Sequence, residues 1–293
     1  LVEVATGKKT VITNERTSVS SPRWSPNGEQ LAFISKASSA KDAQNQIFVL
    51  SMKGGESKQI TKAPKGVQHF SWSPNSTDIA YATLNEPKNK AEIEKGFTAF
   101  EIANNDMFVV SQPQPAHIWL VNTTTAVSKR LTDGDWSLPV VIPPGPPPAP
   151  FSWSADGKTI LFLKVISPYS GDGRNRTIQV LNIADGTYKP LTTRKILENA
   201  PDFSPYASKI SYWYKKDNMG SNINELWVAD TNAGEGKAIA TQLDIDFSYK
   251  AWMPDGKNIL VGGNNDNKTA VFNIGLDGKS SKIDVGNLCS NLN

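Results

Sequence analysis

Residues with catalytic potential are few in this chain of 293 residues. It has two histidines, His69 and His117, and one cysteine, Cys289. A Ser-His-Asp triad needs a histidine as its base, but both histidines stand in strand-like stretches close to Phe70 and Trp119, which favours a structural role. The sequence has no Gly-x-Ser-x-Gly elbow, His-Glu-x-x-His zinc site or glycine-rich phosphate loop. We therefore expect no catalytic residue, metal site or cofactor.

A second group of residues points to ligand binding rather than catalysis. Trp213 and Tyr214 precede a loop rich in Asp and Asn that runs to Glu225, while Glu101 and Asp106 lie in a long insertion. Glu198 and Asp202 flank the entry to the fourth repeat. The simpler interpretation of these polar residues is a solvated loop without a ligand. The alternative is that they line the mouth of the folded domain and contact a substrate or other ligand, and for that binding role we predict the first five.

Charge and composition exclude several classes of partner. The 31 Lys and Arg residues are balanced by 28 Asp and Glu residues, so the net charge of +3 is too small to favour nucleic acid. No apolar run approaches the ~20 residues of a membrane span. One cysteine allows no intrachain disulfide and no thiolate cluster. The sequence leaves the compartment open between periplasm, secretion and cytoplasm.

A repeated motif predicts the elements that position these residues. An aromatic residue followed by a variant of Ser-Pro-Asn/Asp-Gly precedes a short apolar run in each of five copies, which begin at Trp24, Trp72, Trp153, Phe203 and Trp252. Pro presets φ, Asn or Asp tolerates unusual turn conformations, and Gly closes the turn without a Cβ penalty. Each copy therefore predicts a tight β-hairpin whose outgoing strand is buried.

The spacing of the copies predicts the fold. Trp24 and Trp72 are 48 positions apart, and Phe203 and Trp252 are 49 apart, a period typical of propeller blades. A third and a fourth strand follow most copies, so each blade has four strands. We predict an all-β chain, a single β-propeller domain over residues 1–293 with five complete blades and a partial one. The five aromatic residues should occupy equivalent buried places between neighbouring blades.

The two ends and two irregular segments complete the prediction. Residues 1–4 and 10–13 resemble the last two strands of a partial blade, and we interpret the chain as a fragment cut within a propeller. The insertion at roughly 85–115 is expected to hold a helical turn at 88–95 and an extra hairpin around 104–106. The proline-rich segment 139–150 is expected to be a rigid polyproline connector, although it could also bind an SH3-like partner.

Three runs carry a resemblance to a known family: residues 99–108 (AFEIANNDMF), 115–121 (PAHIWLV) and 251–263 (AWMPDGKNILVGG). They resemble the N-terminal propeller of S9 (prolyl oligopeptidase-like) serine peptidases, with the acylaminoacyl-peptidase-like and dipeptidyl-peptidase-like members nearest. The hairpins alone are also similar to TolB-type propellers.

The resemblance implies a function. In S9 peptidases the propeller precedes an α/β-hydrolase domain and screens its active site from large substrates. The implied partners are a C-terminal hydrolase domain of the same parent chain and oligopeptide substrates, with no nucleic acid and no membrane span. The dipeptidyl-peptidase members hold the substrate amino terminus with a Glu-Glu pair, which this sequence lacks. The alternative is a free-standing TolB-like scaffold that binds proteins.

Overall fold

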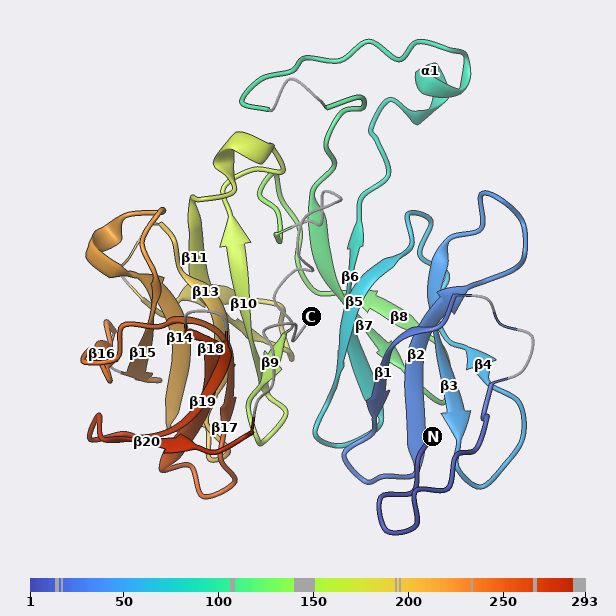
Figure 1. The fold of residues 1–293 in the computed structure, drawn as a ribbon. Coiled ribbons are helices and arrows are strands. Elements are labelled where there is room, and N and C mark those ends of the chain that lie inside the picture. Colours follow the sequence, from blue (N-terminus) through green and yellow to red (C-terminus); the bar gives the residue numbers. More distant parts are fainter. Residues whose placement is uncertain are drawn as a thin grey trace. The chain divides into compact units, whose positions relative to one another are not determined.

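The computed structural model describes residues 1–13, 16, 18–105, 109–139, 151–192, 194, 196–232, 234–265 and 268–286. These residues form five four-stranded antiparallel sheets, which confirms the predicted all-β fold of four-stranded blades (Figure 1). Cys289 and the proline run at 143–148 lie outside the described residues.

The first two sheets follow one another in the chain. The first sheet contains β1 (Ser20–Trp24), β2 (Gln30–Lys36), β3 (Asn45–Ser51) and β4 (Lys58–Gln59). The second contains β5 (Val67–Trp72), β6 (Asp78–Leu84), β7 (Ala116–Asn122) and β8 (Ser128–Arg130).

The other three sheets have the same strand order. The third contains β9 (Ser152–Trp153), β10 (Thr159–Val165), β11 (Arg176–Asn182) and β12 (Tyr188–Pro190). The fourth contains β13 (Asn199–Phe203), β14 (Lys209–Lys215), β15 (Asn224–Asp230) and β16 (Lys237–Ile239). The fifth contains β17 (Asp246–Trp252), β18 (Asn258–Asn265), β19 (Lys268–Gly275) and β20 (Ser280–Ile283).

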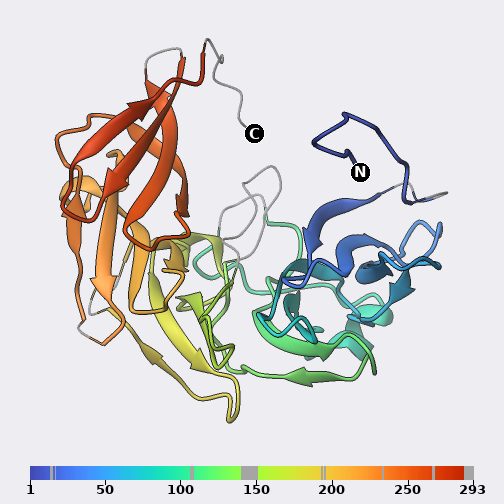
Figure 2. The ribbon, with the colours of Figure 1, turned by 90° about the horizontal axis from the view of Figure 1, so that it is seen from below.

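The chain divides into two compact units. Residues 1–88 and 117–130 make up the first unit, and residues 89–116 and 131–293 make up the second. Within each unit consecutive sheets lie side by side in chain order (Figure 2). The first two sheets share a core that includes Ile34, Ile47 and Ile79, and two further cores lie between the sheets of the second unit. The single domain over 1–293 stays a prediction.

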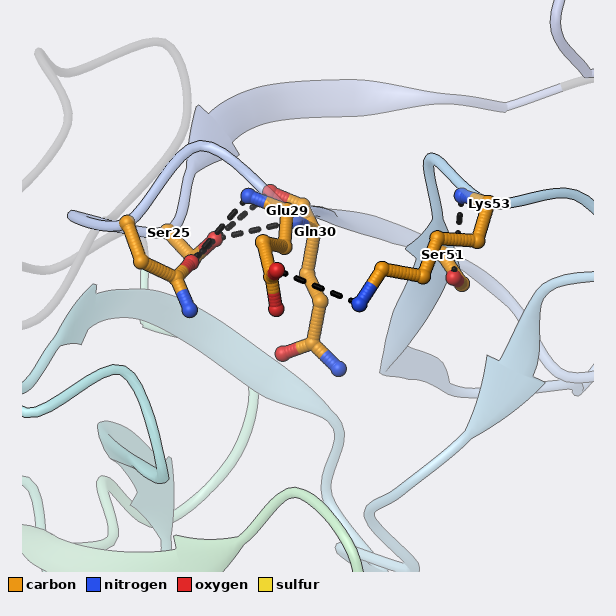
Figure 3. A network of polar contacts seen from close by, with 6 residues as sticks. Ser25, Glu29, Gln30, Ser51 and Lys53 are labelled. Atoms are coloured by element: carbon orange, nitrogen blue, oxygen red, sulfur yellow. Dashed lines mark hydrogen bonds and ion pairs between the residues drawn. The ribbon is translucent and has the colours of Figure 1, made fainter.

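The turn of the first hairpin shows why the repeated motif has its residue types. Ser25 is buried, and its hydroxyl donates to Asn27 Oδ1 at 2.7 Å. The same Asn27 oxygen accepts from the Glu29 N–H at 3.1 Å, and Ser25 Oγ accepts from the Gln30 N–H at 2.9 Å (Figure 3). Gly28 has a φ of 73°, which glycine adopts without strain. The motif thus satisfies the turn's own backbone.

This turn network recurs. Ser73 donates to Asn75 at 2.9 Å, and Ser154 donates to Asp156 at 2.7 Å. Asn and Asp therefore serve the same purpose at this position, because a carboxylate and an amide oxygen accept the same hydrogen bonds. The first strand also carries a register shift in four of the five sheets, at β1, β5, β13 and β17, and such β-bulges bend a strand.

The repeated aromatic residues connect neighbouring sheets. Trp72 Nε1 donates to the Arg23 carbonyl in β1 at 3.0 Å, and Trp252 Nε1 donates to the Asp202 carbonyl in β13 at 3.3 Å. In both cases the acceptor immediately precedes the repeated aromatic residue of the preceding sheet. The indole N–H thereby fixes one sheet on the next.

The prediction of equivalent burial is only partly right. Trp72 and Phe203 are buried, whereas Trp153 and Trp252 are half-buried. For Trp24 the prediction is wrong, because 46% of its surface is exposed. Among the described residues no four-stranded sheet precedes β1, so the Trp24 ring lacks the sheet against which its counterparts pack.

The insertion differs in part from the prediction. The predicted helical turn is present as α1 (Lys90–Glu94). Residues 106–108 of the predicted hairpin lie outside the described residues, so the hairpin stays a prediction, and the described residues on either side of them form no strand. Asn104 connects the insertion to the loop between β10 and β11, because its carbonyl accepts from the Gly171 N–H at 2.9 Å. Its side chain donates to Asp172 Oδ1 at 2.7 Å. The insertion thus contacts the β10–β11 loop within the second unit.

The first ten residues pair with each other. Val2 and Lys9 form an isolated β-bridge, and the amino group of Leu1 donates to the Thr10 carbonyl at 3.0 Å. The pairing matches the predicted last two strands of a partial blade, but the paired stretch is a single bridge.

Candidate functional site

The aromatic and acidic residues of the fourth sheet meet on one face of β14 and β15. Tyr214 lies directly opposite Glu225 in the antiparallel register, so both side chains lie on the same face. Trp227, two positions further along, lies on that face too and donates its Nε1–H to Glu225 Oε2 at 3.3 Å. The rings of Tyr214 and Trp227 meet edge to face, with 5.7 Å between centroids.

Arg194 covers this aromatic pair. Its guanidinium carbon lies 4.1 Å from the centroid of Tyr214 and 4.2 Å from that of Trp227, within the range of cation–π attraction. Glu235 adds an ion pair, with 3.9 Å between Arg194 Nη2 and Glu235 Oε2. The connector between β12 and β13 thereby supplies a cation to the face of the fourth sheet.

Glu198 lies in the same connector and is fully buried. Its Oε2 accepts from the Ile178 N–H of β11 at 2.7 Å. Burial raises the pKa of Glu198 to about 7, against the opposing effects of the Thr192 hydroxyl, the Ile178 N–H and Arg194. Burial likewise raises the pKa of Tyr212, on β14, to about 12. We call this group the Arg194 cluster, and it comprises Thr192, Arg194, Glu198, Tyr212, Tyr214, Glu225, Trp227 and Glu235.

The predicted site residues do not form one group. Tyr214 and Glu225 are neighbours in the Arg194 cluster, but Trp213 lies on the opposite face of β14, where it stacks on Phe247 with 6.0 Å between ring centroids. Trp213 and Tyr214 are each 4% exposed, so both rings are core residues. Their predicted contact with a ligand stays a prediction.

The acidic residues of the insertion are separate from this cluster. Glu101 is exposed, and no described hydrogen bond or ion pair joins it to the cluster. Asp106 lies outside the described residues. The role of both residues in binding substrate therefore stays a prediction.

The polar loop after Tyr214 has a structural explanation. Asn222 Nδ2 donates to the Lys216 carbonyl at 3.0 Å, which closes the loop on itself. Asn224 Nδ2 donates to the Phe247 carbonyl at 3.0 Å, which fastens β15 to β17. The abundance of Asn and Asp here thus reflects side chains that satisfy the loop backbone.

Neither histidine has the setting of a catalytic base. His117 is fully buried in β7. His69, in β5, is half-buried with both ring nitrogens enclosed, and this burial lowers its pKa to about 4. Among the described residues no group of three or more His, Cys, Asp or Glu side chains is placed to hold a metal ion. No described helix is long and apolar enough to cross a membrane.

Of Arg194, Glu198 and Tyr212, only Glu198 stands out in the sequence, as an acidic residue at the entry to the fourth repeat, and no pattern links the three as a group. Arg194 and Glu198 stand in an irregular connector, and Tyr212 follows the alternation of an ordinary buried strand. Only the three-dimensional packing of the third sheet on the fourth brings them together. The cluster thus combines a cation, Arg194, with a carboxyl group, Glu198, whose raised pKa favours its protonated form.

Two proteins with related sequences are much longer than this chain. An uncharacterized peptidase of Bacillus subtilis, YuxL, is 22% identical over 304 aligned residues, which cover 95% of this chain and 44% of that protein. Dipeptidyl-peptidase 5 of Porphyromonas gingivalis is 24% identical over 93% of this chain and 41% of that protein. No family model matches the chain.

Solved structures agree on the fold. The acylaminoacyl peptidase of Pyrococcus horikoshii matches 97% of this chain and 41% of its own, with a TM-score of 0.65 and 17% identity. TolB of Acinetobacter baumannii matches 92% of this chain and 55% of its own, with a TM-score of 0.56 and 17% identity. The chain is a β-propeller like those of TolB and the S9 peptidases. The propeller spans less than half the length of the two related peptidases, to which its homology is distant.

Proposed function

We propose that this propeller is the non-catalytic domain of an S9-type serine peptidase and that it shapes the access of oligopeptides to a hydrolase active site. One observation carries the proposal: the similarity to two proteins named as peptidases extends over nearly the whole propeller and over less than half of each relative. A chain related to one part of a peptidase is best explained as the corresponding part.

The chemistry of the described residues agrees with a non-catalytic role. Tyr214 and Trp227 are already covered by Arg194, and Glu198 is enclosed between sheets. These groups stabilise the packing of the propeller rather than offering a nucleophile beside a base. The hydrolytic residues of the proposed parent would lie in a second domain.

The sequence of the gene beyond the codon for Asn293 gives the first test. A Gly-x-Ser-x-Gly elbow followed by Asp and His, in the order of an α/β-hydrolase triad, is the expected result. An open reading frame that ends without such a segment would contradict the proposal. That result would favour the alternative, a free-standing scaffold that binds proteins. The TolB structure has a similar fold.

The gating role needs a second test on the longer gene product. A series of peptides of increasing length, with one cleavable bond, is hydrolysed by the full chain and by a variant without residues 1–293. If the propeller screens the active site, the full chain loses kcat/KM steeply with peptide length, and the shortened variant does not. Equal length dependence, with both proteins folded and active on the shortest peptide, would refute gating while leaving the assignment to a peptidase intact.

A further inference from the structure

The connector between β12 and β13 carries a buried acid into the contact between the third and fourth sheets. Glu198 has none of its surface exposed, and its Oε2 accepts from the Ile178 N–H in the middle strand pair of the third sheet at 2.7 Å. On the fourth sheet, Tyr212 of β14 lies near enough for the Glu198 carboxylate to add to the increase in its pKa. Glu198 therefore lies where the third and fourth sheets meet.

The backbone on either side of Glu198 is strained. Leu197 has a φ of 65° and Ala200 a φ of 44°, in the left-handed region that residues with a Cβ rarely adopt. Leu197 is held there by burial of its side chain and by a hydrogen bond from its N–H to the Arg174 carbonyl at 2.9 Å. Such a conformation persists only while the surrounding contacts over-determine it.

Several polar atoms around Glu198 are enclosed without a hydrogen-bond partner of good geometry among the described residues. They are Thr192 Oγ1, Arg194 Nε, Glu198 Oε1 and Tyr212 Oη. The charged and titratable groups that face Glu198 are Arg194 from the connector, Tyr212 from β14 and Glu235 from the β15–β16 loop. Arg194 is itself drawn toward Tyr214, Trp227 and Glu235, so it does not neutralise Glu198 by a direct ion pair.

We propose that Glu198 is a proton-controlled latch: in its protonated form it holds the connector between the third and fourth sheets, and its ionisation releases the connector. A neutral carboxyl group suits an enclosed site in which Glu198 Oε2 accepts from the Ile178 N–H and Oε1 has no hydrogen-bond partner among the described residues. An ionised carboxyl group in the same enclosed place lacks the water and the paired cation that it needs.

The electrostatics set the pH at which the latch operates. Burial raises the pKa of Glu198 from 4.5 to about 7, and Glu235 adds to the increase, whereas Arg194 opposes it. Ionisation therefore falls near neutral pH. Release of the connector also lets the strained residues Leu197 and Ala200 relax. Local opening is therefore favoured both by the ionisation of Glu198 and by the relief of backbone strain.

Hydrogen exchange measured by mass spectrometry tests the latch. The wild type, Glu198→Gln and the control Glu225→Gln are compared at pH 6 and pH 8, with rates corrected for the intrinsic pH dependence of amide exchange. In the wild type, protection of residues 191–200 and of the Ile178 amide should fall about tenfold or more between the two values of pH. Glu198→Gln should keep the same protection at both, because the amide stays neutral, and Glu225→Gln should behave as the wild type does.

Protection in the wild type that does not change between pH 6 and pH 8 would overturn the proposal. The same holds if Glu198→Gln folds and still shows the wild-type change. If Glu198→Gln does not fold, the titration of ¹³C-labelled glutamate carboxyl groups in the wild type decides. A resonance that titrates near pH 7, and whose shift accompanies changes in the Ile178 amide, supports the latch; ordinary acidic titration of every glutamate refutes it.

Discussion

At the scale of single residues, Glu198 makes the stability of the propeller depend on pH. Its pKa is raised in the folded state, so the folded protein binds a proton more tightly than the unfolded chain, and stability falls as the pH rises from about 4.5 through about 7. The full shift corresponds to about 3 kcal/mol lost at pH 8. Glu198→Gln should therefore raise the melting temperature at pH 8 and change it little at pH 5.

Thermal unfolding followed by circular dichroism at both pH values measures this effect. Glu225→Gln is the matched control, because Glu225 lies in the same cluster but is only half-buried. An equal change in melting temperature at pH 5 and pH 8 for Glu198→Gln would show that charge is not the cause.

Arg194 is the other residue whose effect is specific. A desolvated cation over two aromatic rings is worth about 2 kcal/mol, and its long side chain also covers Tyr214 and Trp227. Arg194→Leu should destabilise the propeller by about 1 to 2 kcal/mol in urea unfolding, whereas Lys189→Leu, an exposed change on β12, should leave it within about 0.5 kcal/mol. Equal effects of the two changes would contradict a specific role of the guanidinium.

At the scale of elements, the repeated tryptophans offer a matched pair of positions. Trp72 is buried and donates to the Arg23 carbonyl, whereas Trp24 occupies the same place in the motif and is 46% exposed. Trp72→Ala should cost about 3 to 5 kcal/mol, and Trp24→Ala should cost less than about 1.5 kcal/mol. Equal costs in denaturant unfolding would mean that Trp24 is covered in solution.

The same elements show how far sequence alone could lead. The hairpins were predictable because Ser, Asn or Asp, and Gly satisfy the turn locally, as Ser25 and Asn27 do. The insertion was not, because Asn104 bonds to the β10–β11 loop, a contact 68 positions away. The Arg194 cluster was not predictable either, since it depends on how the third sheet packs on the fourth.

At the scale of the whole molecule, the proposed function makes the chain dependent on a second domain for hydrolysis. His117 is enclosed in β7, and burial lowers the pKa of His69 to about 4, so neither histidine is suited to act as a general base for a serine at neutral pH. The purified chain of 293 residues should therefore hydrolyse neither acyl-aminoacyl nor aminoacyl-proline chromogenic substrates. The assay is run beside the longer gene product as the active control, with and without a serine-directed inhibitor. If the isolated chain hydrolyses these substrates and the inhibitor abolishes the hydrolysis, the chain contains a nucleophile of its own. That result would refute the proposal that hydrolysis depends on a second domain.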